Sequence, residues 1–77
     1  MVFEKCRDIV ADQLGMDKES ITLESNLVDD IGADSLDTVE ILLAIENEFG
    51  IELKDEEKIE KLKTFKDIVD YVESLIK

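Results

Sequence analysis

The sequence contains no histidine and no proline, and it has a single cysteine, Cys6. Without histidine, no serine or cysteine in the chain has the side-chain base that usually activates a catalytic nucleophile. A single cysteine excludes an internal disulfide and a zinc cluster. We therefore predict no catalytic residue and no metal site, and we expect Cys6 to be a small buried side chain near Phe3, Ile9 and Val10.

Basic residues are missing from the whole middle of the chain, since no Lys or Arg occurs from Glu19 to Leu53. The same stretch holds ten acidic residues, so it carries −10 of the formal net charge of −12. Such a surface repels nucleic acid and anionic membranes and attracts basic protein surfaces. We expect neither a nucleic-acid nor a membrane partner. A solvated acidic surface without any partner is the alternative interpretation.

Long apolar runs are also missing, and none of those present could span a membrane. The N-terminal stretch is charged and unlike a signal peptide, so we expect a cytosolic protein. A chain of 77 residues forms at most one domain, residues 1–77, which we expect to be a monomer. The hydrophobic content of 44% predicts a folded chain.

Apolar residues recur at helical spacing along most of the chain. The pattern predicts helices over residues 2–14 and 35–49, ending at Gly15 and Gly50, and a short helix over about residues 55–62. Asp34 or Ser35 can cap the second helix, and Thr64 begins the last one. The predicted fold is an all-α four-helix bundle of three longer helices and one short helix. The buried stripe expected in the last helix consists of Phe65, Ile68, Val69, Val72 and Ile76.

Residues 16–34 form a long connection whose apolar residues neither alternate as in a strand nor repeat as in a helix. A loop of this length in a compact domain usually has a function. We expect an ordered loop, containing at most one short helical turn, that its apolar side chains pin to the core. These side chains are Ile21, Leu23, Leu27, Val28 and Ile31.

The second predicted helix has two apolar stripes when its residues are placed about 100° apart. One stripe, which includes Ile41 and Ile45, is an ordinary core face. The other consists of Leu36, Val39 and Leu43, and acids flank it. An apolar strip with a charged rim predicts a docking site, while a helix buried on most sides is the alternative. The predicted docking residues are Leu36, Asp37, Val39, Glu40, Leu43, Glu46 and Asn47.

The acidic residues from Asp29 to Glu40 could be mistaken for an EF-hand calcium loop. In that register Ile31 and Ala33 occupy ligand positions, and Asp34 stands where the turn requires glycine. The pattern therefore predicts no calcium loop, and only weak, nonspecific binding of divalent cations to the acidic face.

Ser35 stands where the second helix begins, and it is the strongest candidate for a functional residue. A phosphodiester on its oxygen would lie at a helix N-terminus, where unpaired amides and the helix dipole favour an anion. Because serine is also common at helix starts, a purely structural role is the alternative.

The stretch from Gly32 to Glu40 decides between these roles. It reads Gly-Ala-Asp-Ser-Leu-Asp-Thr-Val-Glu and resembles the prosthetic-group motif of the acyl carrier proteins, most closely the freestanding carriers of bacterial-type (type II) fatty acid synthesis. The resemblance extends along nearly the whole chain. It includes Gln13-Leu14-Gly15, Glu46-Asn47-Glu48-Phe49 and Asp70-Tyr71-Val72.

This resemblance implies that Ser35, between Asp34 and Leu36, receives 4′-phosphopantetheine from coenzyme A. A separate holo-carrier synthase, a phosphopantetheinyl transferase, would add it. The terminal thiol of the arm would carry the growing acyl chain as a thioester, and the core of a four-helix bundle would open to shelter that chain. Fatty acid synthesis enzymes would dock through basic patches onto Leu36, Val39, Glu40, Leu43 and Glu46.

Three positions depart from the family pattern. Lys54 stands where many members have proline, the stretch from Lys58 to Lys63 is about one residue longer, and Asn47 replaces a common acid. None of them touches the attachment motif. A carrier for a polyketide or other specialised pathway, and an unmodified acidic interaction module, are the alternative functions.

Overall fold

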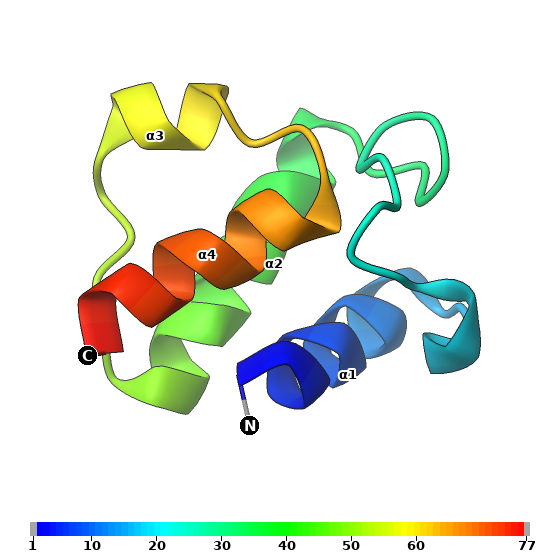
Figure 1. Ribbon diagram of the computed structural model, residues 1–77, viewed down its shortest axis with the longest axis horizontal. Coiled ribbons are helices and arrows are strands. Elements are labelled where there is room, and N and C mark those ends of the chain that lie inside the picture. The colour runs from blue at the N-terminus through cyan, green and yellow to red at the C-terminus, as the bar shows by residue number, and fades with distance from the viewer. Residues whose placement is uncertain (1, 77) are drawn as a thin grey trace.

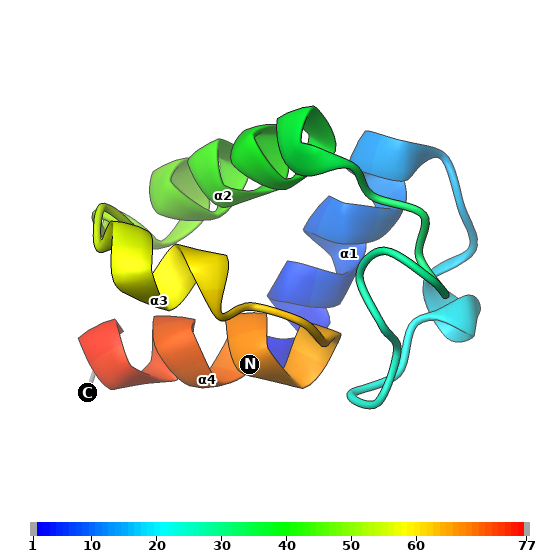
Figure 2. The same ribbon diagram turned by 90° about the horizontal axis from the view of Figure 1, so that it is seen from above.

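The computed structural model describes residues 2–76 and contains four α-helices and one turn of 3₁₀ helix. The helices are α1 (Val2–Leu14), α2 (Ser35–Phe49), α3 (Glu56–Glu60) and α4 (Phe65–Ile76). The 3₁₀ turn η1 (Lys18–Ser20) lies in the long connection between α1 and α2. In Figure 1, α1, α2 and α4 pack together, and Figure 2 shows the short α3 between α2 and α4. The predicted fold of three longer helices and one short helix is confirmed.

The predicted boundaries of α1 and α2 agree with the structure, and α4 begins at Phe65, one residue after the predicted Thr64. The largest difference is in α3. This helix ends at Glu60, two residues before the predicted end. Lys61 N donates to Lys58 O at 3.1 Å, and Leu62 N donates to Ile59 O at 3.2 Å. These bonds span three residues instead of four, so the chain keeps turning here in a tighter, non-α conformation.

The core lies between α1, α2 and α4 and is built from branched aliphatic and aromatic side chains. Phe3 of α1 packs edge-on against the fully buried Phe65 of α4, with ring centroids 5.5 Å apart. Cys6 is fully buried, as predicted, and burial followed by the charge of Glu73 raises the pKa of its thiol to about 12. The largest fully buried side chains are Phe65, Ile41, Ile45, Ile68, Val10, Val72 and Cys6.

The last turn of α4 differs from the prediction. Ile76 was expected in the buried stripe, but it is 41% exposed because it lies in the final turn of α4, where Ser74 and Leu75 are exposed as well. Tyr71 is buried instead. Its hydroxyl oxygen accepts a hydrogen bond from Asp55 N at 3.3 Å, which ties the start of α3 to α4.

The long connection is ordered by hydrogen bonds to the start of α4. Leu27 N donates to Lys63 O at 2.9 Å, and Phe65 N donates to Ser25 O at 2.9 Å. Ile21, Leu27 and Ile31 are buried as predicted, and Leu23 is partly buried. The prediction for Val28 was wrong, because this side chain is 68% exposed.

Gly50 ends α2 in the left-handed conformation, with φ at 65°, and its N–H donates to Glu46 O at 2.8 Å. Glycine adopts this conformation without the steric cost that a Cβ imposes, which explains why the helix ends here. Across residues 2–76, every helix is too short or too polar to cross a membrane.

Candidate functional site

The start of α2 is fixed by a reciprocal pair of hydrogen bonds. Asp34 is the N-cap, and its side chain accepts from Asp37 N at 2.9 Å. The Asp37 carboxylate in turn accepts from Asp34 N at 3.3 Å, which completes a capping box. Of the two candidate caps in the sequence, Asp34 therefore caps the helix, and Ser35 is its first helical residue.

Ser35 is exposed, and its hydroxyl has no hydrogen-bond partner among the described residues. The backbone amides of Ser35 and Leu36 also lack an acceptor within residues 2–76, because the cap satisfies Asp37 N instead. The hydroxyl of Ser35 is therefore accessible to solvent. The two unpaired amides and the positive end of the helix dipole beside it favour an anion attached at this position.

The chain that leads into Ser35 is held firmly. Ala33 is buried, and its N–H donates to Leu27 O at 2.8 Å. Gly32 before it has φ at 78°, a conformation that favours glycine and that turns the chain toward the helix. The hydroxyl of Ser35 is therefore presented at a defined place on the surface.

The second apolar stripe of α2 is exposed, as predicted. Leu36 is 65% exposed, Val39 is 51% exposed and Leu43 is 54% exposed. On the other side of the helix Ile41, Leu42 and Ile45 are buried, and Phe49 is partly buried. Thus α2 presents to solvent an apolar strip that begins next to Ser35.

Two of the acidic side chains around this strip accept hydrogen bonds from other parts of the chain. Glu46 Oε2 accepts from Leu53 N at 2.6 Å, across the turn at Gly50, and the side chain of Glu40 accepts from Gln13 Nε2 of α1. No local sequence pattern indicates either hydrogen bond. Among the described residues, no Lys or Arg forms an ion pair with Asp37, Glu40 or Glu46. Asn47 is exposed.

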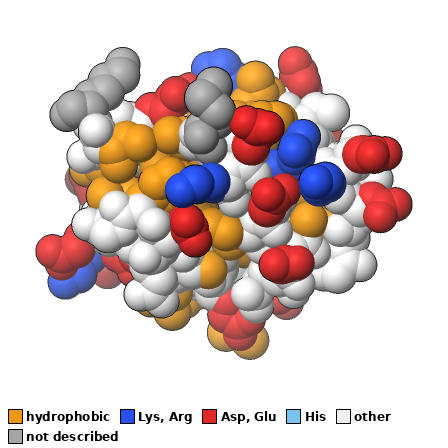
Figure 3. Space-filling view, turned by 90° about the horizontal axis from the view of Figure 1, so that it is seen from below, with side chains coloured by type: hydrophobic (Ala, Val, Ile, Leu, Met, Phe, Trp, Pro, Cys, Tyr) orange, Lys and Arg blue, Asp and Glu red, His pale blue; other side chains and the backbone are white. Residues whose placement is uncertain are grey.

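Two ion pairs lie at the C-terminal end of α2 and just after it, at the opposite end of the helix from Ser35. Lys5 pairs with Glu48 at 3.4 Å, and the exposed Lys54 pairs with Glu52 at 2.6 Å, where a hydrogen bond and the charge of Lys54 lower the pKa of Glu52. Figure 3 shows the face seen from below, on which basic and acidic side chains are interspersed beside an apolar patch. Asp37 and Glu40 beside the strip form no ion pair among the described residues, whereas Lys54 lies close enough to Glu46 for the charge of Glu46 to contribute to the raised pKa of Lys54.

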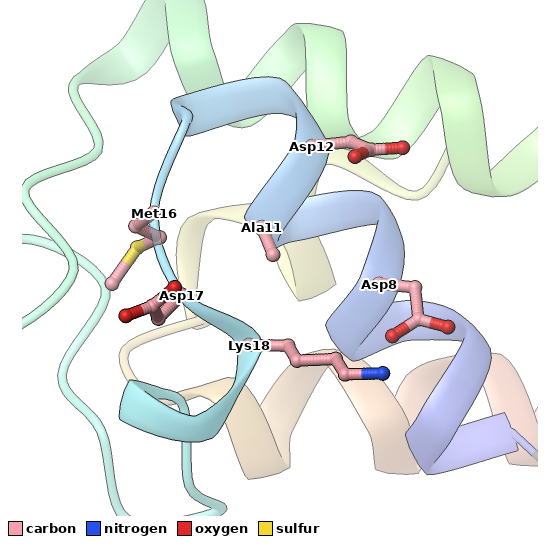
Figure 4. A pocket seen from close by; sticks show the side chains of 6 residues that line it. All are labelled: Asp8, Ala11, Asp12, Met16, Asp17 and Lys18. Atoms are coloured by element: carbon pink, nitrogen blue, oxygen red, sulfur yellow. The ribbon is translucent and has the colours of Figure 1, made fainter.

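Two hollows of the surface lie away from Ser35. One, of about 390 Å³, lies between α1 and η1 and is shown in Figure 4. The other, of about 290 Å³, lies between α3 and α4 and includes Tyr71. Neither is lined by a residue of the capping box, and within residues 2–76 no cluster of His, Cys, Asp or Glu is arranged to hold a metal ion.

Comparison with known proteins identifies the family of the chain. A protein-family model described as a phosphopantetheine attachment site matches residues 4–72. An acyl carrier protein from Clostridium acetobutylicum is 54% identical over 74 residues, which cover 96% of this chain and 95% of that protein. The chain belongs to the acyl carrier proteins.

The fold agrees with this assignment. A solved structure from Mycobacterium tuberculosis, described as that of a candidate acyl carrier protein, superposes with a TM-score of 0.89 at 28% identity, covering 96% of this chain and 97% of that one. Acyl carrier proteins are not enzymes. They hold acyl cargo on covalently bound 4′-phosphopantetheine and present it to partner enzymes. This acyl carrier protein is therefore a non-catalytic protein with phosphopantetheine as its cofactor.

Proposed function

We propose that Ser35 is the residue that carries 4′-phosphopantetheine, and that this acyl carrier protein serves fatty acid synthesis. The observation that supports the proposal most strongly is the exposed, unpaired hydroxyl of Ser35 at the first position of α2, inside the nine-residue motif from Gly32 to Glu40. We infer that residues 1–77 act as one carrier domain. The monomeric state and the cytosolic location remain predictions.

The attachment step uses the Ser35 oxygen as the nucleophile. A transferase would supply the base that takes the hydroxyl proton, since the chain has no histidine. The oxygen forms a bond to the phosphorus next to the pantetheine of coenzyme A, the pyrophosphate bond breaks, and adenosine 3′,5′-bisphosphate leaves. When bound, the arm supplies a terminal thiol that carries an acyl group as a thioester.

The residues at the start of α2 fit such a phosphodiester. The amides of Ser35 and Leu36 lie within the first turn and have no other acceptor among the described residues, so they can donate toward the phosphate oxygens. Asp34 stabilises the first turn of the helix as its N-cap, because its carboxylate accepts a hydrogen bond from Asp37 N. Leu36, which is 65% exposed, offers an apolar surface beside the attachment point.

Partner enzymes would dock on the strip of Leu36, Val39 and Leu43. Burial of these exposed side chains would supply the apolar part of the interface. The nearby charges of Asp37, Glu40 and Glu46 would attract a rim of Lys and Arg on the partner and raise the association rate. Asn47 adds a neutral polar side chain to the same surface.

Intact-mass measurement after incubation with coenzyme A and a phosphopantetheinyl transferase tests the attachment. The wild type should gain one phosphopantetheine, and Ser35→Ala should gain none. Ser20→Ala is the matched control, since Ser20 is an exposed serine in η1, away from the start of α2, and this variant should be modified like the wild type. A wild type without a mass change would reject the carrier proposal and favour the unmodified interaction module.

A carrier for a polyketide or other specialised pathway would share the attachment chemistry. The acyl groups found on the protein from its native source separate the two functions. Saturated and partly reduced straight chains of increasing length would support fatty acid synthesis, whereas polyketide or other unrelated acyl groups would support the specialised pathway.

A further inference from the structure

Val28 has the largest exposed fraction, 68%, among the exposed large hydrophobic side chains of the described residues. Its neighbours along the chain behave differently, because Leu27 is 4% exposed and Ile31 is 9% exposed. Val28 is therefore an exposed apolar side chain in a segment whose neighbouring apolar side chains, Leu27 and Ile31, are buried.

The backbone holds Val28 in this exposed position. Asn26 Oδ1 accepts from the amides of both Val28 and Asp29 at 2.9 Å. Asp30 Oδ2 accepts from Asn26 N at 2.8 Å, so Asp30 serves the turn itself. The carboxylate of Asp29 has no hydrogen bond within residues 2–76, and Asp29 is exposed beside Val28. An ordered turn thus presents one apolar side chain and one acid to solvent.

This turn lies close to Ser35. The bond from Ala33 N to Leu27 O, 2.8 Å long, closes the loop between them. Val28 is one residue from Leu27, and Ser35 is two residues from Ala33, so chain geometry limits the separation of their Cα atoms to roughly 17 Å. A typical interface of about 800 Å² per partner is roughly 30 Å across, so one partner can cover both residues. Figure 1 shows the loop and the start of α2 at the same upper edge of the molecule.

We propose that Val28, with Asp29, is an additional docking contact for the transferase that modifies Ser35. The inference rests on the proposed attachment at Ser35. The transferase must bring its catalytic centre to the hydroxyl of Ser35 itself, so its surface meets the immediate surroundings of that residue. Enzymes that act on the thiol work at the far end of the arm, so docking on the α2 strip does not require them to cover the loop at Val28 as well. The matching surface of the transferase would be a shallow apolar pocket flanked by Lys or Arg, because the loop carries acids and no bases.

Steady-state kinetics of phosphopantetheine transfer to Val28→Ser test the proposal. We expect KM for the carrier to rise about fivefold with kcat unchanged, as for the loss of one partly buried aliphatic contact. Leu75→Ser is the matched control, since Leu75 is also exposed, at 42%, but lies near the end of α4. Its KM should stay within about twofold of the wild-type value, as expected for a substitution at a surface residue that does not contact the transferase. Asp29→Asn should make KM less dependent on salt concentration.

The outcomes separate this proposal from the attachment itself. If Val28→Ser and Leu75→Ser have the same KM as the wild type, the Val28 contact is rejected while attachment at Ser35 stands. If Val28→Ser raises the KM of an enzyme that acylates the thiol of the holo protein as much as it raises the KM of the transferase, the assignment of this contact to the transferase is overturned. If Ser35→Ala is modified as readily as the wild type, the proposed attachment residue is wrong.

Discussion

Asp34 and Asp37 exchange hydrogen bonds across the first turn of α2, one of 2.9 Å to Asp37 N and one of 3.3 Å to Asp34 N. Ser35 lies between them in the chain and takes no part in the exchange. The acids on either side of the proposed attachment residue therefore have a structural role in addition to their charge. The capping box fixes the first turn, and this leaves the serine hydroxyl available.

The cap predicts a difference between two substitutions of Asp34. Asp34→Ala removes the acceptor for Asp37 N and should lower the free energy of unfolding by about 1 kcal/mol. Asp34→Asn keeps a side-chain oxygen at the cap and should lose clearly less. Urea unfolding at neutral pH measures both values. Equal losses for the two variants would show that the hydrogen bond to Asp37 N is not what stabilises the turn.

Leu42 and Leu43 are adjacent residues of α2 that face opposite environments, 5% and 54% exposed. Leu42→Ala should lower the free energy of unfolding by roughly 3 kcal/mol, because it leaves a cavity in the core. Leu43→Ala should change it by less than about 1 kcal/mol. If the strip is a docking surface, Leu43→Ala should instead weaken binding to a basic partner enzyme about fivefold. Unfolding curves and titration calorimetry on both variants check these values, and unchanged binding by Leu43→Ala would contradict the docking role.

Asp67 predicts a pH dependence at the start of α4. Its carboxylate accepts from Lys63 N at 2.9 Å and Thr64 N at 3.1 Å, and these bonds, that of Lys63 foremost, lower its pKa from 3.8. Because the pKa of Asp67 is lower in the folded state than in the unfolded state, its charged form stabilises the fold. This contribution is fully present above the unfolded-state pKa of 3.8 and is lost as the pH falls through the lower, folded-state pKa. Asp67→Ala should therefore cost about 1 kcal/mol near neutral pH, and progressively less below about pH 4.

The matched control for Asp67 is Thr64→Ala. Thr64 Oγ1 accepts from Asp67 N at 3.3 Å, and a hydroxyl does not titrate in this range. The Thr64 hydroxyl is one of the smaller causes of the lowered pKa of Asp67, so the cost of Thr64→Ala, measured by denaturant unfolding at several pH values, should change less with pH than that of Asp67→Ala. A cost for Asp67→Ala that is the same at pH 3 and pH 7 would contradict the assigned role of the charge.

The buried Cys6 predicts a difference in thiol reactivity between the two forms of the protein. Because the thiol is fully buried and its pKa is raised to about 12, it should not react with a thiol reagent at mildly alkaline pH. The unmodified protein should show no reactive thiol until it is unfolded, whereas the holo protein should show one. Titration with a chromogenic disulfide reagent, with and without denaturant, measures this. A reactive thiol in the folded, unmodified protein would contradict the burial of Cys6.

The helices could be predicted because their signals are local. The apolar period, Gly15, Gly50 and the cap of α2 each act within a few residues, and they place α1 and α2 correctly. The exposed stripe of α2 could also be predicted, since the spacing of Leu36, Val39 and Leu43 separates it from the core face.

The remaining features depend on contacts between distant residues. The bond from Leu53 N to Glu46 joins residues on either side of the turn at Gly50, and no local pattern indicates it. Val28 has an apolar side chain typical of a core residue, but the hydrogen bond from its amide to Asn26 Oδ1 holds the turn so that this side chain faces solvent. Ile76 continues the apolar period of α4 past the point where other elements cover it. Periodicity gives the direction of a side chain on its own element, and the neighbouring elements decide whether it is buried.

The location of the cofactor tests the central claim most directly. After reaction with coenzyme A and a phosphopantetheinyl transferase, the protein should be digested and the modified peptide fragmented in a tandem mass spectrometer. We predict that the added phosphopantetheine lies on Ser35 alone. Phosphopantetheine found on Ser20, Ser25 or Ser74, or absent from the chain, would contradict the account.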